Sequence, residues 1–399
     1  MALSERKNTP ISDAEMQRRW ALARAVMAEH KIDALLMQNN NDHMGGYVRW
    51  FTDVPACNGY PVSIVFPRDG LMSLVRQGPF GLSRDLDDGG DGFLRGVGHL
   101  YGTPSYASAP YTNEYDPELL IEALRPFAHA TIGLLGTYQM SFALVDYMKR
   151  HLPNARFVDV SDAIDMVKVI KSPEEMELCV RTARVQDGAM RAAFAALRPG
   201  MTDSQVAAVA QKYCHDHGTE MGIYLCASWP EGDSSHFGGW HAGSRVIRKG
   251  DVYTLLVETN GPGGMYCELG RTAVVGRASA LLKDEFAFTL QARQFTNALL
   301  QPGAKPADIW NEYNAFMVRN GRPAESRLYC HGQGYDLVER PLIRMDETMP
   351  IQKDMNIVVH PTYQKDGVLS WICDNYPITA NGPGQRMHEF PEEIVELDF

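Results

Sequence analysis

The sequence predicts two domains of different class, an α/β domain over residues 1–160 and an α+β domain over residues 161–399. Three observations predict this division. Short apolar strands alternate with helices in the first part, and the chain then becomes strongly helical from Ile164. Near the centre of the second part, a glycine-rich hairpin carries Glu258 and Glu268 on its two arms. A chain of 399 residues is also longer than one small core needs.

The elements of the first domain follow from apolar spacing and capping residues. Ser12 is expected to cap a helix that runs to His30, with apolar positions at helical intervals. Residues 78–111 are rich in Gly, Asp, Ser and Tyr and are expected to form loops. The other expected elements are strands at 34–37, within 61–75 (two, joined at Arg68-Asp69-Gly70), at 131–135 and at 156–159, and helices at 116–127 and 141–152.

Helices dominate the start of the second domain. Ser172 is expected to cap a helix that begins at Pro173 and runs to Leu197, since proline favours the first helical position. Further helices are expected at 203–217, 280–300 and 305–320, with strands between them. The order helix, helix, strands therefore occurs twice after residue 170, which indicates a duplicated half-domain.

The central hairpin is expected to bring two carboxyl groups together. An apolar run at 252–257 leads into Asn260-Gly261-Pro262-Gly263-Gly264, and glycine supplies the positive φ angles of a tight reversal. Glu258 and Glu268 would then lie on adjacent strands. Two buried carboxylates cost free energy unless a metal, a cation or a shared proton compensates them, so the pair predicts a functional site.

Composition excludes several classes of partner. The net charge of −11 and the lack of a Lys/Arg-rich run argue against nucleic acid or an anionic membrane. No apolar stretch has membrane-spanning length, and residues 1–20 lack a signal-peptide core. The seven cysteines are scattered without a C-x-x-C motif, as suits reduced thiols. We expect a cytoplasmic protein that acts on a small molecule.

Several motifs follow one another in the second domain. They stand at 165–176, 198–202, His241, 249–251, Cys267-Glu268-Leu269-Gly270-Arg271-Thr272, His331-Gly332-Gln333-Gly334 and 339–341. This series resembles the pita-bread family, which includes creatinase, prolidase, aminopeptidase P and methionine aminopeptidase. The resemblance covers the whole chain, because creatinase and prolidase also carry a smaller α/β N-terminal domain. It implies a pita-bread catalytic domain over residues 161–399.

The resemblance implies a dimetal site that this sequence has altered. Peptidases of the family hold two ions with Asp, Asp, His, Glu and Glu, and hard cations need such oxygen-rich sets. These positions fall on Leu256, Glu268, His331, His360 and Cys373. We therefore expect no cofactor. If a metal is present, a single Zn, Fe or Mn at Glu268, His331 and His360 is the alternative.

Creatinase is the relative that such changes resemble most. It implies a hydrolase that splits a C–N bond with histidine and glutamate as acid and base. The expected catalytic residues are His241, Glu258, Glu268, His331 and His360. The expected substrate-binding residues are Arg271, Cys373, Asp374, Trp240, Tyr335 and Tyr60.

Arg271 is expected either to hold a substrate carboxylate or to neutralise Glu268. The resemblance also implies a homodimer in which the N-terminal domain, with Tyr60, reaches the site of the partner subunit. Three other functions stay open: a metal-dependent Xaa-Pro dipeptidase or aminopeptidase, a lyase acting on a small charged metabolite, and a partner-binding protein without activity. Fold sets the cavity and not its ligand, so the substrate stays open as well.

Overall fold

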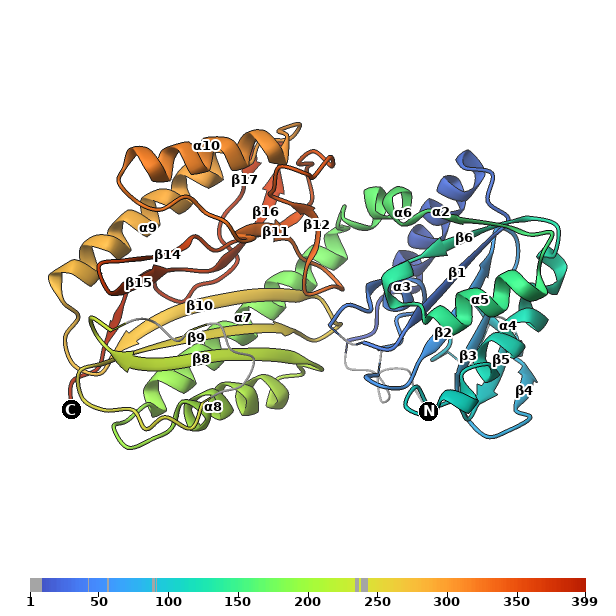
Figure 1. The fold of residues 1–399 in the computed structure, drawn as a ribbon, viewed down its shortest axis with the longest axis horizontal. Coiled ribbons are helices and arrows are strands. Elements are labelled where there is room, and N and C mark those ends of the chain that lie inside the picture. The colour runs from blue at the N-terminus through green and yellow to red at the C-terminus, as the bar shows by residue number, and fades with distance from the viewer. Residues whose placement is uncertain are drawn as a thin grey trace. The chain divides into compact units, whose positions relative to one another are not determined.

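The computed structural model describes residues 9–41, 43–55, 57–87, 90, 92–233, 237 and 243–399. They form two compact units, Met1–Lys168 and Val169–Phe399 (Figure 1). The division follows Lys168 and not residue 160, because helix α6 (Ser161–Lys168) packs against α2 (Asp13–Glu29) of the first unit. Within the described residues, none of the helices combines the length and apolar character that a membrane crossing needs.

The first unit is built on a seven-stranded mixed sheet. Its strand order is β4-β5-β3-β2-β1-β6-β7, and β1 pairs antiparallel with β2 and parallel with β6. Helices α4 and α5 supply Leu120, Leu124, Leu144 and Met148 to the core cluster that also contains residues of the sheet. The strands are β1 (Ala34–Asn39), β2 (Val62–Pro67), β3 (Met72–Gln77), β4 (Ser83–Asp85), β5 (Val97–Thr103), β6 (Thr131–Leu135) and β7 (Arg156–Asp159). The helices beside α2 and α6 are α3 (Gly46–Thr52), α4 (Tyr115–Leu124) and α5 (Phe142–His151).

Two strands lie where the sequence predicted only loops. β4 and β5 fall within residues 78–111, and β5 pairs with β3 in parallel. Strand β5 contains Gly98 and Gly102, which interrupt the alternation of side chains that marks a strand. A Cβ at these glycines would lie 2.8 Å from Leu71 Cβ and 2.7 Å from Leu82 Cβ, respectively. Packing of neighbouring leucines thus explains the glycines, and the prediction of loops was wrong here.

The second unit holds two main sheets with helices outside them (Figure 1). The sheets have the orders β18-β10-β9-β8 and β12-β11-β13-β16-β17, and β14 with β15 forms a separate hairpin. Helices α7 and α8 cover one face of the first sheet. The helices are α7 (Pro173–Ala196), α8 (Asp203–Asp216), α9 (Ala280–Leu299) and α10 (Pro306–Arg319). The strands are β8 (Gly222–Pro230), β9 (Asp251–Asn260), β10 (Tyr266–Val274), β11 (Cys330–Gly332), β12 (Glu339–Leu342), β13 (Asn356–Val359), β14 (Thr362–Lys365), β15 (Val368–Trp371), β16 (Asp374–Thr379), β17 (Gly382–Pro383) and β18 (Val395–Glu396).

The predicted helix starts of this unit are confirmed. The Ser172 hydroxyl accepts from the Glu175 N–H, the Glu175 carboxylate accepts from the Ser172 N–H, and Pro173 opens α7. Thr202 and Gln205 form the same reciprocal cap on α8. These caps satisfy backbone donors that the first turn of a helix leaves unpaired. Local chemistry therefore places both helices that cover the first sheet.

Strand β9 is buried on both faces. Its side chains point alternately to the two faces, and this decides which of them reach the site. Leu255 and Val257 join the core cluster under α7 and α8. Leu256 joins the cluster on the opposite face, and Glu258 follows it on that face because strand side chains alternate. The hairpin turn between β9 and β10 uses positive φ at Gly263 and Gly264, as predicted.

Candidate functional site

Glu258 and Glu268 are direct partners across β9 and β10. Each residue is only 5% exposed, so the predicted adjacency and burial of the pair are both found. Burial raises the pKa of Glu268 to about 7. Burial and the negative charge of Glu268 raise the pKa of Glu258 well above its ordinary value. Since two adjacent carboxylates cannot easily both ionise, the pair retains one proton near neutral pH.

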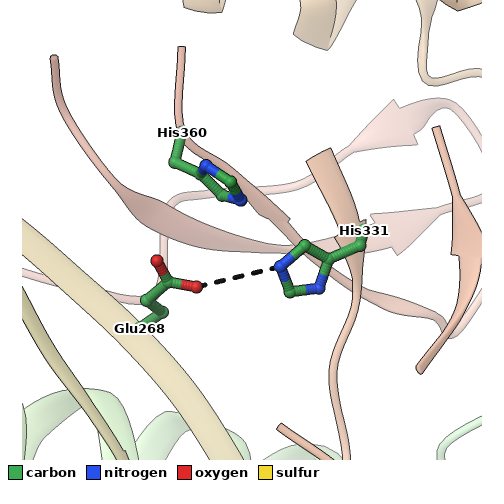
Figure 2. Close-up of side chains that lie close together, drawn as sticks. All are labelled: Glu268, His331 and His360. Atoms are coloured by element: carbon green, nitrogen blue, oxygen red, sulfur yellow. Dashed lines mark ion pairs between the residues drawn. The ribbon is translucent and has the colours of Figure 1, made fainter. Parts of the chain in front are cut away.

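Two histidines from other strands complete a cluster with Glu268. His331 lies on β11, and His360 directly follows β13. Figure 2 shows the three side chains converging from separate segments of the chain. His331 Nε2 lies 3.9 Å from Glu268 Oε2, and one ligand atom from each of Glu268, His331 and His360 lies within 4.8 Å of the others.

Both histidines are neutral at neutral pH. His331 Nδ1 lies 2.9 Å from the carbonyl oxygen of Gly332, which can only accept, so Nδ1 carries the proton and the Nε2 lone pair faces Glu268. Burial lowers the pKa of His331 to about 4 and that of His360 well below its usual value. Among the described residues, His360 Nε2 is buried without a hydrogen-bond partner, so it is available to a ligand or a water molecule.

A chain of side-chain amides, which sequence reasoning did not identify, supports the carboxyl pair. Gln333 Nε2 donates to Glu258 Oε1 at 3.0 Å and to Glu268 Oε2 at 3.5 Å. Asn375 Nδ2 donates to Gln333 Oε1 at 2.8 Å and to Asn356 Oδ1 at 3.0 Å. Gln333 stood within the motif 331–334, Asn375 stood directly after the predicted Asp374, and Asn356 stood four residues before His360, so nearness to these residues was the available signal.

The cavity beside this cluster has a volume of about 610 Å³. Its lining contains the carboxyl pair and both histidines, and most of its other lining residues are apolar. Among its described lining residues, Arg327 is the only lysine or arginine. The full lining consists of Leu225, Phe237, Leu256, Glu258, Glu268, Arg327, Leu328, His331, Val338, His360, Thr362, Tyr363, Gln364, Leu369 and Trp371. Such a cavity suits a small molecule with both polar and apolar parts.

Arg271 and Asp374 do not belong to the cavity, which corrects the prediction that they bind substrate. Arg271 is 1% exposed, and its Nη2 lies 2.8 Å from Asp374 Oδ1. Arg271 stands three positions after Glu268 on the same strand, so the two side chains point to opposite faces. Arg271 therefore neither reaches a substrate nor neutralises Glu268. Its role is to pair a buried carboxylate in the core.

The other predicted substrate-binding residues have different positions. Cys373 is fully buried and donates to the main-chain oxygen of Glu268 at 3.5 Å, so it packs beside the site but does not line the cavity. Tyr335 is 4% exposed and does not line the cavity either. Tyr60 belongs to the first unit, where it is 47% exposed, and its role stays a prediction. Trp240 and His241 lie outside the described residues.

Comparison with known proteins identifies the family. Residues 177–385, more than half of the chain, match metallopeptidase family M24. The chain belongs to this family. The M24 relatives include the uncharacterized peptidase YqhT of Bacillus subtilis, 25% identical over 66% of this chain and 72% of the relative. They also include creatinase of a Bacillus species, 23% identical over 90% of this chain and 83% of the relative.

Solved structures confirm the pita-bread M24 fold. The X-Pro aminopeptidase of Thermotoga maritima matches with a TM-score of 0.79 at 16% identity, covering 95% of this chain and 99% of that one. The Xaa-Pro dipeptidase of Bacillus anthracis matches with a TM-score of 0.75 at 17% identity, covering 96% and 100%. At these identities the match concerns the fold. Membership of M24, with its peptidase and creatinase relatives, supports a hydrolase of C–N bonds.

The family name implies metal ions, and the donor atoms of this M24 protein test that implication. Leu256 offers no ligand atom, and burial raises the pKa of the Cys373 thiol well above its usual value. These residues do not fit a pair of ions. Glu268, His331 and His360 do form an N₂O donor set of the right size for one ion, with His360 Nε2 free to bind it.

Proposed function

We propose that this M24 protein is a creatinase-like hydrolase that cleaves a C–N bond in a small polar metabolite without a dimetal centre. The observation that carries the proposal is the position of Glu258 and Glu268, buried side by side in a cavity with two neutral histidines. Leu256, on the same strand face, replaces a ligand that two metal ions would need. These observations support acid and base catalysis over dimetal catalysis.

The carboxyl pair supplies both the general base and the general acid of the reaction. Its ionised member acts as general base and removes a proton from the attacking water, whose oxygen bonds to the substrate carbon. Its protonated member donates a proton to the nitrogen as the C–N bond breaks. One water is consumed and the proton inventory of the pair is restored, because one proton is taken up and one is released.

The neutral histidines position the water and add no positive charge to the cavity. His331 presents its Nε2 lone pair toward Glu268, and His360 Nε2 has no hydrogen-bond partner in the part of the chain that the structure describes. Each can accept a hydrogen bond from a water molecule or from a substrate N–H group. Their neutrality follows from burial, and it leaves the ionised carboxylate as the strongest base in the cavity.

Metal analysis tests the proposal. Protein purified without chelators and active on its substrate is expected to contain far less than one ion per chain, and chelation is expected to leave turnover unchanged. Near-stoichiometric Mn, Zn, Co or Fe, with activity lost on chelation and restored by the ion, would contradict it. The substrate for this assay comes from a thermal-shift screen of guanidino acids, ureido acids, cyclic amidines, betaines and proline dipeptides, since ligand binding raises apparent stability.

A second candidate function keeps one metal ion, and the compact cluster of Glu268, His331 and His360 favours it. These residues would hold Zn, Fe or Mn, and the ion would supply Lewis-acid activation of a carbonyl group and of water. The reaction proposed for this metal-dependent form is hydrolysis of Xaa-Pro dipeptides, because a relative in Pyrococcus furiosus is named Xaa-Pro dipeptidase. Assays of Xaa-Pro dipeptides with and without added Mn distinguish the two candidates. A homodimer and a cytoplasmic location are part of the leading proposal. Light scattering of the purified protein tests the homodimer.

A further inference from the structure

The lining of the cavity carries charged groups of both signs. Glu258 and Glu268 supply the carboxyl groups of this lining. Arg327 adds a guanidinium to the same lining, which the sequence analysis did not single out. A ligand in this cavity therefore meets both the carboxyl pair and a cationic side chain.

Arg327 is held in place by only one of its nitrogens. Its Nη2 lies 2.9 Å from Glu325 Oε2 and 3.4 Å from the carbonyl oxygen of Thr362. Glu325 is itself fixed, because its Oε1 accepts from the main-chain N–H groups of Ser326 and Arg327 at 2.9 and 2.8 Å, and its side chain is 4% exposed. Arg327 Nε and Nη1 have no hydrogen-bond partner in the described part of the chain.

This arrangement differs from that of the buried arginines. Arg271 directs all three of its nitrogens at carbonyl or carboxylate oxygens in the core and leaves nothing for a ligand. Arg327 has a side chain that is 53% exposed, lines the cavity and keeps two nitrogens unengaged. A guanidinium that is oriented before binding loses little freedom when it meets a planar anion.

We propose that Arg327 is a substrate-binding residue that receives a carboxylate, so the substrate carries a carboxylate in addition to its scissile C–N bond. This assignment rests on the proposed function in treating the cavity as the substrate site. A monoanionic carboxylate fits the charges better than a phosphate, because a dianion would meet one guanidinium, already shared with Glu325, in a cavity that also holds the carboxyl pair.

The test compares each acid of the five-class panel with its own carboxamide, starting with guanidinoacetate against guanidinoacetamide and ureidoacetate against ureidoacetamide. Affinities are measured by calorimetry and thermal shift on wild type, Arg327→Gln and Arg327→Lys. Arg344→Gln is the matched control, because Arg344 lines a neighbouring hollow with Arg327 and pairs with Asp346 but does not line the catalytic cavity.

At least one acid is expected to bind wild type about tenfold or more tightly than its carboxamide, as loss of a charge-assisted hydrogen bond predicts. Arg327→Gln is expected to remove that preference, Arg327→Lys to keep part of it, and Arg344→Gln to keep all of it. Equal affinities for acid and amide, an unchanged preference in Arg327→Gln, or no stabilisation by any acid would overturn the assignment. Unfolding temperatures of all variants confirm that they are folded.

Hydrolysis assays on the same compounds separate this inference from the proposed function. A carboxylate preference that depends on Arg327, without hydrolysis of any panel member, would leave the subsite standing and sink the proposed reaction. Hydrolysis that proceeds equally on acids and amides would support the reaction and sink the subsite.

Discussion

The side-chain amide of Gln333 donates to Glu258 Oε1 at 3.0 Å. Main-chain groups at both ends of the amide chain that contains Gln333 determine which amide atoms donate and which accept. Gln333 Nε2 also donates to the carbonyl oxygen of Leu337 at 3.0 Å, which can only accept. At the other end, Asn375 Oδ1 accepts from the Glu268 N–H at 2.8 Å, so Asn375 Nδ2 must donate to Gln333 Oε1. One directed chain of amides therefore orients the carboxyl pair.

Replacing Gln333 tests this support. Gln333→Met keeps the side-chain length and removes the donor, so the Glu258 carboxyl loses its fixed orientation. We expect kcat to fall about tenfold to hundredfold with a smaller change in KM, because misorientation affects the reaction step more than binding. Steady-state kinetics on the identified substrate measure both constants. The control is Gln186→Met: Gln186 is equally buried and donates to Thr259 and Cys267 rather than to the pair. Loss of activity in both variants alike would refute a specific role for Gln333.

Removing one charge of the pair should stabilise the protein while it abolishes turnover. A carboxyl with a raised folded-state pKa contributes stability below its unfolded pKa of 4.5, and that stability is lost as the pH rises through the folded value, about 7 for Glu268. Glu258→Gln is therefore expected to raise the free energy of unfolding by about 1 kcal/mol above neutral pH. It is also expected to lower kcat at least about a hundredfold, because it removes one of the two groups that carry out general acid–base catalysis. Urea unfolding and kinetics measure the two effects.

Glu285→Gln is the matched control, with an effect of opposite sign. Hydrogen bonds from Arg322, Tyr363 and Lys365 outweigh burial and lower the pKa of Glu285, so its charge stabilises the fold. Its neutralisation is expected to destabilise the protein by about 1 to 3 kcal/mol. A destabilised Glu258→Gln would show that the carboxyl pair is structural.

The Arg271–Asp374 pair should matter for stability and not for substrate binding. Asp374 is fully buried and lies within 3.0 Å of three guanidinium groups, those of Arg271, Arg293 and Arg386. Arg271→Met is expected to cost about 1–3 kcal/mol, because Asp374 keeps the guanidinium groups of Arg293 and Arg386 while the buried main-chain oxygens that accept from Arg271 lose their donor. The surface-exposed Arg327→Gln is expected to change stability by less than about 0.5 kcal/mol. Chemical unfolding gives the stabilities, and an altered KM in the folded fraction of Arg271→Met would argue against a purely structural pair.

His388 should make the protein sensitive to acid. It is 2% exposed, Gln186 Oε1 lies 2.9 Å from its Nε2, and burial lowers its pKa from 6.5 to about 4. The charged groups that face it are Asp374, Asp187, Arg271 and Arg386. Because the unfolded chain binds the proton more readily, stability is expected to fall as the pH decreases from 6.5 toward 4.

The titration of His388 can be isolated by a variant. His388→Gln cannot take up the proton, so its unfolding free energy should fall less over the same pH interval, although its value at neutral pH is lower. The slopes of unfolding free energy against pH, from urea titrations, measure the difference. Parallel slopes for wild type and variant would assign the acid sensitivity to other groups.

Local features were predictable from the sequence because they depend on neighbours along the chain. Capping by Ser172 and Thr202 and the glycine turn after Asn260 each involve contacts over a few residues. Adjacency of Glu258 and Glu268 follows from that turn and strand register. Strand β5 escaped prediction because its glycines fit the leucines of other segments and not a local pattern.

The sequence by itself determined the two domains' character, the helix starts and the acidic hairpin, while tertiary structure alone decided which side chains share the cavity. Gln333 reaches Glu258 from 75 positions away in sequence, and Asn375 reaches Glu268 from 107 positions away. Arg271 turned into the core, and Arg327 became the cation of the cavity, because the alternation of strand faces and the packing of sheets decide what each side chain meets. Such contacts between distant segments have no counterpart in local spacing.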